Sequence, residues 1–130
     1  MVTYHKRKYH NSKAVAGCLL FDSKKEARRH TQLQLLQAAG AIRDLQTQVK
    51  FVLIPAQRAE DTVGKRGGRK QGKLLERECA YIADFVYTDC ATGETVVEDV
   101  KGYKGGGAYA VFTIKRKLML YVHGIRIREV

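Results

Sequence analysis

The 130-residue sequence has no tryptophan, a single proline, three cysteines and no long hydrophobic run. No apolar stretch approaches the roughly 20 residues that a membrane span requires, which argues against a transmembrane protein. Cys18, Cys79 and Cys90 form no Cys-x-x-Cys pair, so neither a zinc knuckle nor a disulfide framework is indicated. The basic start lacks the apolar core of a signal peptide, and we expect a reducing cytoplasm.

Positive charge is the strongest bulk property of the chain. Lysine and arginine number 24 against 13 acidic residues, giving a net charge of +11. The excess lies in residues 1–13, 56–75 and 104–117, which together carry 14 basic and two acidic residues. Basic charge concentrated in a few segments is typical of proteins that bind the phosphate backbone of nucleic acids. The alternative is a positively charged surface that only promotes solubility.

The first half of the sequence predicts a helix, a strand and a long loop. Ser23 and Glu26 form an S-x-x-E capping box, and Gly40 lies where a helix that begins there would end. Residues 47–54 are rich in strand formers and are followed by the only proline. Residues 56–75 contain four glycines and no periodicity, which predicts a basic loop.

The second half predicts a hairpin, a helix and an edge strand. Two β-rich runs flank the turn "TDCATGE", and "IRIREV" at the end of the sequence alternates as a strand does. The run "AYAVFTIKRKLMLYVHG" predicts a helix that ends at Gly124. Its predicted apolar face consists of Ala110, Ile114, Leu118 and Tyr121.

This element order predicts an α/β fold in one domain. The order αβββαβ gives a small mixed four-stranded sheet and two helices. We expect a basic N-terminal arm over residues 1–20 and a single domain over residues 21–130 that includes the basic loop 56–75.

The stretch "VVEDVKG", residues 96–102, places charged side chains in an apolar strand. Asp99 and Lys101 share one face, because side chains on a strand alternate. If Tyr87 pairs with Val96 across the hairpin, Asp84 lies opposite Asp99 on the same face. Two such carboxylates repel each other unless a divalent cation lies between them, and oxygen ligands favour Mg²⁺ or Mn²⁺. An ion pair of Lys101 with either aspartate, and no metal, is the alternative.

These residues carry a resemblance. "ADF" followed by "EDVK" resembles the signature of the PD-(D/E)XK, or restriction-endonuclease-like, nuclease superfamily. Asp84 matches its first aspartate, Asp99 its second acid and Lys101 its lysine. Ala83 replaces the usual proline, and Glu98 competes with Asp99 as the acid, although only Asp99 shares a face with Lys101. Five blocks are similar to a group of small phage and prophage proteins of that superfamily: "FDSKKEARR", "QVKFVLIP", "YIADFVY", "VVEDVKG" and "KRKLMLYVHGIRIREV".

The resemblance implies a restriction-endonuclease-like core and metal-dependent hydrolysis of DNA phosphodiester bonds. Mg²⁺, or Mn²⁺, would be held by Asp84, Asp99, the backbone carbonyl of Val100 and Glu26, while Lys101 would orient and help to deprotonate the attacking water. Glu26 also has a purely structural explanation, the capping box. Gln48 lies where related nucleases sometimes place an accessory glutamine on the first strand; the alternative is a solvated strand residue.

The basic segments imply a DNA partner held through its backbone. Phosphate contacts are expected from Lys65, Arg66, Arg69, Lys70, Lys104, Lys115 and Lys117. Such contacts carry little base information, which favours structure-specific or nonspecific cleavage, for example of branched, recombining or replicating phage DNA in the bacterial cytoplasm. Many proteins of this fold act as homodimers, although no stripe for dimerisation is visible here. The alternatives are a non-catalytic DNA-binding protein on the same fold and a basic RNA-binding protein.

Overall fold

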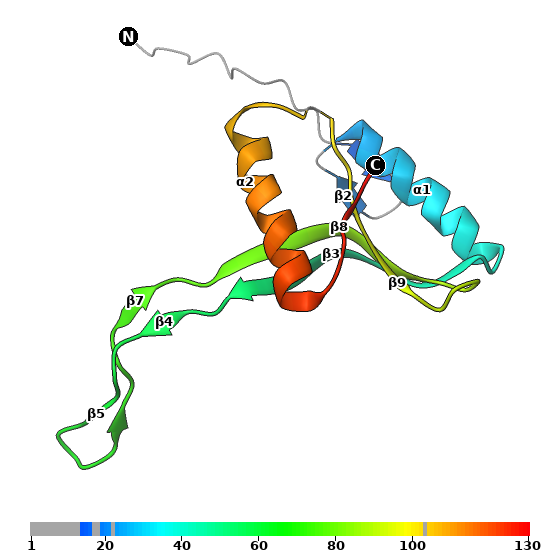
Figure 1. The fold of residues 1–130 in the computed structure, drawn as a ribbon. Helices are drawn as coiled ribbons and strands as arrows, with labels where there is room; N and C mark the ends of the chain where they lie inside the picture. Colours follow the sequence, from blue (N-terminus) through cyan, green and yellow to red (C-terminus); the bar gives the residue numbers. More distant parts are fainter. Residues whose placement is uncertain (1–13, 17–18, 22, 103) are drawn as a thin grey trace, which may run out of the picture. The chain divides into compact units, whose positions relative to one another are not determined.

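The computed structural model describes residues 14–16, 19–21, 23–102 and 104–130 as a mixed α/β protein. A four-stranded sheet has the order β10–β9–β8–β3, with β10 parallel to β9 (Figure 1). The predicted order αβββαβ and the mixed four-stranded sheet are confirmed. The elements of this core are α1 (Lys24–Ala38), β3 (Ile42–Ile54), β8 (Cys79–Asp89), β9 (Thr95–Asp99), α2 (Gly106–Leu118) and β10 (Arg128–Glu129). The predicted basic arm lies largely outside the described residues.

The chain divides into two compact units. The first contains the described residues up to Leu45 together with Tyr87–Val96, and the second contains Gln46–Val86 and Val97–Val130. Both are discontinuous in sequence, because β3, β8 and β9 contribute residues to each. Every predicted site residue except Glu26 belongs to the second unit.

Helix α1 of the first unit begins and ends where the sequence predicts. The Ser23 hydroxyl accepts a hydrogen bond from the N–H of Glu26 at 3.1 Å, as an N-cap does. At the other end Gly40 has a φ of 79°, and the N–H of Ala41 donates to the carbonyl of Leu36 at 2.9 Å. This is the bond of a Schellman motif, which glycine favours because it adopts positive φ without strain.

A small antiparallel pair of strands accompanies α1. Strands β1 (Ala14–Ala16) and β2 (Leu19–Phe21) pair with each other, and α1 lies against both. Phe21 and Leu33 are buried, and the Phe21 ring lies 4.9 Å from the ring of His30. Ile42 and Tyr87 are also buried hydrophobic residues of the first unit.

The core of the second unit lies between the sheet and α2. The helix ends in a π-helical turn, η1 (Met119–His123), and Gly124 follows with a φ of 68°, as predicted. None of the helices in the described part of the chain is long and apolar enough to cross a bilayer. The buried cluster consists of Leu53, Tyr81, Ala83, Val97, Phe112, Met119 and Ile127.

The predicted apolar face of the second helix is wrong at Ala110, Ile114 and Tyr121, whereas Leu118 packs against the core as predicted. Ile114 is 60% exposed and Tyr121 is 88% exposed, whereas Phe112 and Met119 pack into the core. Helix α2 is apolar on more than one side, so periodicity alone supports several stripes. Contact with the sheet selects the side that contains the large Phe112 ring.

Residues 56–75 form a β-ribbon and not the predicted irregular loop. Strand β4 (Gln57–Arg58) pairs with β7 (Leu74–Glu76), and β5 (Thr62–Val63) pairs with β6 (Arg69–Lys70). The ribbon continues β3 and β8 away from α2 (Figure 1). Strands of two or three residues are too short to show a period of two, so their pairing is not visible in the sequence.

Candidate functional site

Asp99 and Lys101 of the EDVK stretch form an ion pair at the end of β9. The ammonium of Lys101 lies 2.8 Å from Oδ1 of Asp99, and the hydroxyl of Tyr81 donates to Oδ2 at 2.7 Å. Asp99 is only 6% exposed. A carboxylate buried this deeply requires partners of this kind. The ion pair expected by the metal-free alternative is therefore present.

Helix α2 contacts Lys101 through Phe112. The ammonium of Lys101 lies 3.5 Å from the centre of the Phe112 ring, the geometry of a cation–π contact. A cavity of about 370 Å³ opens beside this pair. Its lining includes Tyr81, Asp99, Lys101, Phe112 and Lys115. The cavity offers an anion both an ammonium group and a second lysine.

The side chain of Asp84 bonds to the backbone of the same stretch. Its Oδ2 accepts the N–H of Val100 at 2.8 Å, and its Oδ1 accepts from the amide of Gln48 at 3.5 Å. Val100 lies between Asp99 and Lys101, so the first aspartate is bonded to the centre of the motif. The N–H of Val100, directly after the end of β9, is thus satisfied by a side chain of β8.

Electrostatics couples the three motif residues. Burial raises the pKa of Asp84 above its usual value, and the negative charge of Asp99 raises it further. The Val100 N–H, the Gln48 amide and the charge of Lys101 act in the opposite direction without cancelling the rise. Two carboxylates close enough to perturb each other, in a partly buried place, are an arrangement that a cation stabilises.

The two aspartates nevertheless bond to different groups. Tyr81, the partner of Asp99, is buried on the side of β8 opposite to that of Asp84 by strand alternation. Asp84 lies outside the lining of the 370 Å³ cavity. Neither observation supports the predicted same-face pairing of Asp84 with Asp99, which stays a prediction.

Glu26 belongs to the other unit. It is buried, 4% exposed, in the first turn of α1, where its backbone N–H is capped by Ser23. The Ser23 N-cap accounts for the position of its backbone, and its predicted role as a ligand remains a prediction.

Gln48 has an unusual backbone. Its φ is 53°, in the left-handed region that non-glycine residues rarely adopt, although it lies within β3. Strained residues of this kind collect at functional sites, where the surrounding structure holds them. The conformation accompanies a side chain that reaches Asp84, and the accessory role of Gln48 stays a prediction.

A second acid and cation pair lies next to Asp99 and was not predicted. Glu129 of β10 is the partner of Asp99 across the parallel ladder. It accepts from the Tyr109 hydroxyl at 2.9 Å and from Arg116 at 3.2 Å. Burial alone would raise the pKa of Glu129, but these bonds and the charge of Lys104 lower it. The alternation of "IRIREV" was the only sequence signal for this carboxylate.

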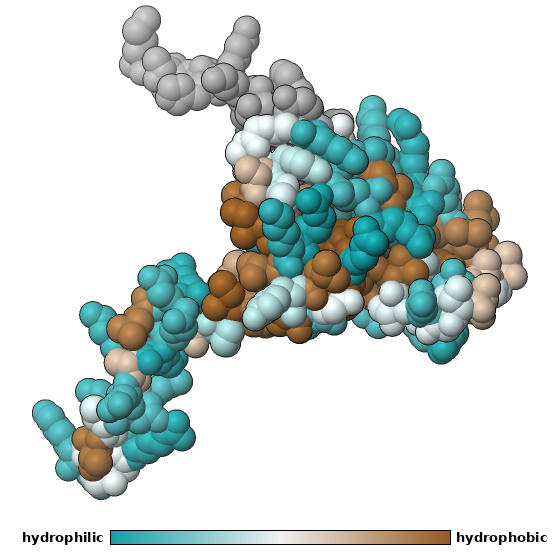
Figure 2. Space-filling model, in the orientation of Figure 1, coloured by the Kyte–Doolittle hydropathy of each residue, from teal (hydrophilic) through white to brown (hydrophobic). Residues whose placement is uncertain are grey.

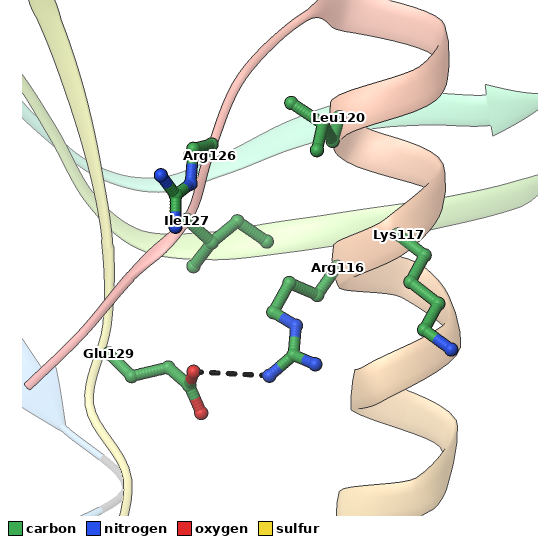
Figure 3. A pocket seen from close by; sticks show the side chains of 6 residues that line it. All are labelled: Arg116, Lys117, Leu120, Arg126, Ile127 and Glu129. Atoms are coloured by element: carbon green, nitrogen blue, oxygen red, sulfur yellow. Dashed lines mark hydrogen bonds and ion pairs between the residues drawn. The ribbon is translucent and has the colours of Figure 1, made fainter.

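This second pair borders another cavity, of about 290 Å³. Figure 3 shows Arg116 directed towards Glu129, with Lys117 on the same helix and Arg126 on the segment before β10. The predicted phosphate-contacting lysines of α2 thus divide between the two cavities. Lys115 lines the one beside Asp99, and Lys117 lines this one.

The described residues contain no group of three or more His, Cys, Asp and Glu side chains placed to hold a metal ion. Near the motif, the second unit contains the carboxylates of two aspartates, the Val100 carbonyl and the Gln48 side-chain amide. Mg²⁺ usually binds proteins through one or two carboxylates and completes its shell with water and substrate phosphates. The oxygen donors present are of the type that such an ion uses.

The fold and the site define a small mixed α/β protein in which the Asp84 carboxylate bonds to the backbone between Asp99 and Lys101, and Asp99 pairs with Lys101. The chain belongs to the family described as "Protein of unknown function (DUF1064)", which it matches over residues 6–127. No curated protein and no solved structure matches it.

Proposed function

We propose that this protein is a metal-dependent DNA endonuclease with a restriction-endonuclease-like core of the PD-(D/E)XK type. One observation carries the proposal. The Asp84 carboxylate is bonded to the backbone N–H of Val100, between Asp99 and Lys101, and the charges of both affect its pKa. Two acids and a lysine concentrated in this way, in a chain of net charge +11, favour chemistry on a polyanion.

The proposed cofactor is Mg²⁺ or Mn²⁺. Asp84 and Asp99 would hold the ion, with the carbonyl of Val100 as a further ligand. When bound, the ion polarises the scissile phosphate and stabilises negative charge on the leaving oxygen. The raised pKa of Asp84 supports this assignment, because a cation relieves the repulsion that contributes to it.

The protein groups then position the reactants. The Lys101 ammonium, which contacts Asp99 and the Phe112 ring, would orient the attacking water and stabilise the charge on the phosphate. Tyr81 fixes the orientation of the Asp99 carboxylate. Lys115 lines the same cavity and is suited to an adjacent phosphate. Water attack forms one P–O bond as the bond to the leaving sugar oxygen breaks.

The substrate follows from the distribution of charge. Contacts from lysine and arginine to phosphates position DNA without reading its sequence. We therefore propose structure-specific or nonspecific cleavage, with branched or replicating phage DNA as the biological substrate.

A non-catalytic DNA-binding protein is the second candidate. The Lys101–Asp99 ion pair is compatible with this candidate, because a buried carboxylate requires a cationic partner even in a protein without catalytic activity.

Cleavage assays separate the two candidates. Plasmid and branched oligonucleotides are incubated with the protein in Mg²⁺, in Mn²⁺ and in EDTA, alongside Lys101→Ala and the exposed control Lys24→Ala. We expect cleavage only with metal, a loss of roughly 100-fold or more in Lys101→Ala, and normal cleavage by Lys24→Ala. Tight DNA binding with no cleavage in any divalent metal would establish the binding protein instead.

A further inference from the structure

The β-ribbon of residues 57–76 concentrates positive charge at its far end. Residues 62–73 contain five basic residues and no acid, whereas Glu60, Asp61 and Glu76 lie nearer its base. Lys65 and Arg66 occupy the centre of the terminal turn, which the Gly67 N–H closes onto the Gly64 carbonyl at 3.0 Å. Both side chains are exposed, and Figure 2 shows mainly hydrophilic side chains over the ribbon.

The ribbon is held in shape by its own contacts. The Asp61 carboxylate accepts a hydrogen bond from the Gly72 N–H at 2.9 Å, between the β4–β7 and β5–β6 pairs. The same carboxylate forms an ion pair with Arg69 of β6. Arg58 donates to the Gly72 carbonyl at 3.2 Å. Gly72 lies so close to the Ala59 carbonyl that a Cβ would overlap it. A segment pinned in this way is an ordered projection.

The two faces of the ribbon tip differ. Val63 pairs with Arg69, and Thr62 pairs with Lys70, so each pair shares a face. The Arg69 charge is balanced by Asp61, whereas the other face presents Lys70. Val63 shares the face of Arg69 and is 78% exposed, so it is accessible for contact with a base edge.

We propose that this ribbon enters the major groove of duplex DNA, with Lys65, Arg66 and Lys70 on the flanking phosphates. The inference rests on the proposed function for its DNA partner and extends it to a duplex beside the cleavage site. Strands lie about 4.8 Å apart in a ribbon. Such a ribbon fits the major groove of B-DNA, which is roughly 12 Å wide.

The composition of the ribbon argues against single-stranded DNA and duplex RNA as its ligand. Surfaces that bind single strands use aromatic side chains on which bases stack. Residues 56–76 contain no Phe, Tyr, Trp or His. The major groove of A-form RNA is deep and too narrow for protein elements to read. B-form duplex is the nucleic acid that a basic ribbon without aromatics fits.

Binding of the full chain to fluorescent DNA in EDTA tests this without cleavage. The ribbon variant Lys65→Gln/Arg66→Gln is compared with the control Lys24→Gln/Arg28→Gln, which removes the same charges from exposed positions of α1. We expect the ribbon variant to lose affinity for a 30-base-pair duplex by roughly tenfold per lost phosphate contact at 0.1 M salt, with a shallower salt dependence. The control variant should bind as wild type does.

A second duplex, with bulky substituents at C5 of its cytosines, obstructs the major groove only. We expect wild type to bind it as weakly as the ribbon variant binds the unmodified duplex. Equal losses for duplex and single strand, or preferential binding to duplex RNA, would overturn the inference, as would normal binding to the obstructed duplex. If the protein cleaves DNA and the ribbon substitutions do not weaken binding, only this inference is contradicted. If binding depends on the ribbon and no cleavage occurs, only the proposed nuclease activity is contradicted.

Discussion

The ammonium of Lys101 lies 2.8 Å from the buried carboxylate of Asp99. This contact has two consequences for any experiment on the site. Removing the lysine takes away the proposed catalytic cation, and it also leaves a negative charge poorly compensated in the interior. Loss of activity in a single variant therefore does not separate chemistry from folding, and the variants below are chosen in pairs.

The first pair isolates the ion pair. Lys101→Met should lower the free energy of unfolding by about 2–4 kcal/mol, because Asp99 then keeps only the Tyr81 hydroxyl. The double variant Asp99→Asn/Lys101→Met should recover most of this loss, since it removes the buried charge as well. Urea unfolding measures both.

Nuclease activity should stay absent in the double variant even though its stability returns. A double variant that cleaves DNA at the wild-type rate would show that neither group acts in the reaction.

The hydroxyl of Tyr81 should contribute to stability through Asp99. Tyr81→Phe removes a 2.7 Å bond to a buried carboxylate, and we expect a loss of about 1.5–3 kcal/mol in urea unfolding. Tyr109→Phe removes the corresponding bond to Glu129, which keeps Arg116 and is less buried, so the loss should be about 1 kcal/mol or less. Equal losses of stability in the two variants would show that the bond from Tyr81 to Asp99 contributes no more than the bond from Tyr109 to Glu129.

The packed side of α2 can be checked by alanine substitution. Phe112→Ala should cost about 3–5 kcal/mol, because it empties a core position under Lys101. Ile114→Ala should change stability by no more than about 0.5 kcal/mol, since Ile114 is mostly exposed and alanine favours helix. The reverse order in thermal or urea unfolding would restore the face predicted from periodicity.

Gly72 should be required for the ribbon. Gly72→Ala places a methyl group against the Ala59 carbonyl, whereas Gly68→Ala meets no atom within 4 Å. We expect faster trypsin cleavage at the ribbon arginines and lysines in Gly72→Ala and wild-type protection in Gly68→Ala. Similar protection in the two variants would show that the ribbon adapts without cost.

The Asp61 carboxylate should titrate below its ordinary value of 3.8. The Gly72 N–H, then Arg69, lower the pKa of Asp61, and Arg69→Gln should raise it while leaving it under 3.8 because the Gly72 bond remains. A depressed pKa in the folded state stabilises the ribbon above pH 3.8 and ceases to do so as the pH falls through the folded value. The shift of the Gly72 amide in NMR spectra against pH measures this, and an unchanged titration in Arg69→Gln would contradict it.

Local rules predicted local features well. The caps of α1 at Ser23 and Gly40 and the end of the second helix at Gly124 depend on backbone groups a few residues apart, so the sequence carries them directly. The element order follows from the same local signals. The pairing of residues 56–75 was missed because its strands are short and their partners lie on the other side of a turn.

The sequence by itself determined which residues are present for chemistry: Asp84, Asp99 and Lys101 at the motif, and the clustered cations of residues 56–75. Only the tertiary structure decided what those residues touch. Tyr81 and Phe112 come to Lys101 and Asp99 from another strand and from α2, and Glu129 comes through the parallel ladder. Such contacts depend on the docking of elements distant in sequence, where burial and packing, and not local propensity, set the free energy.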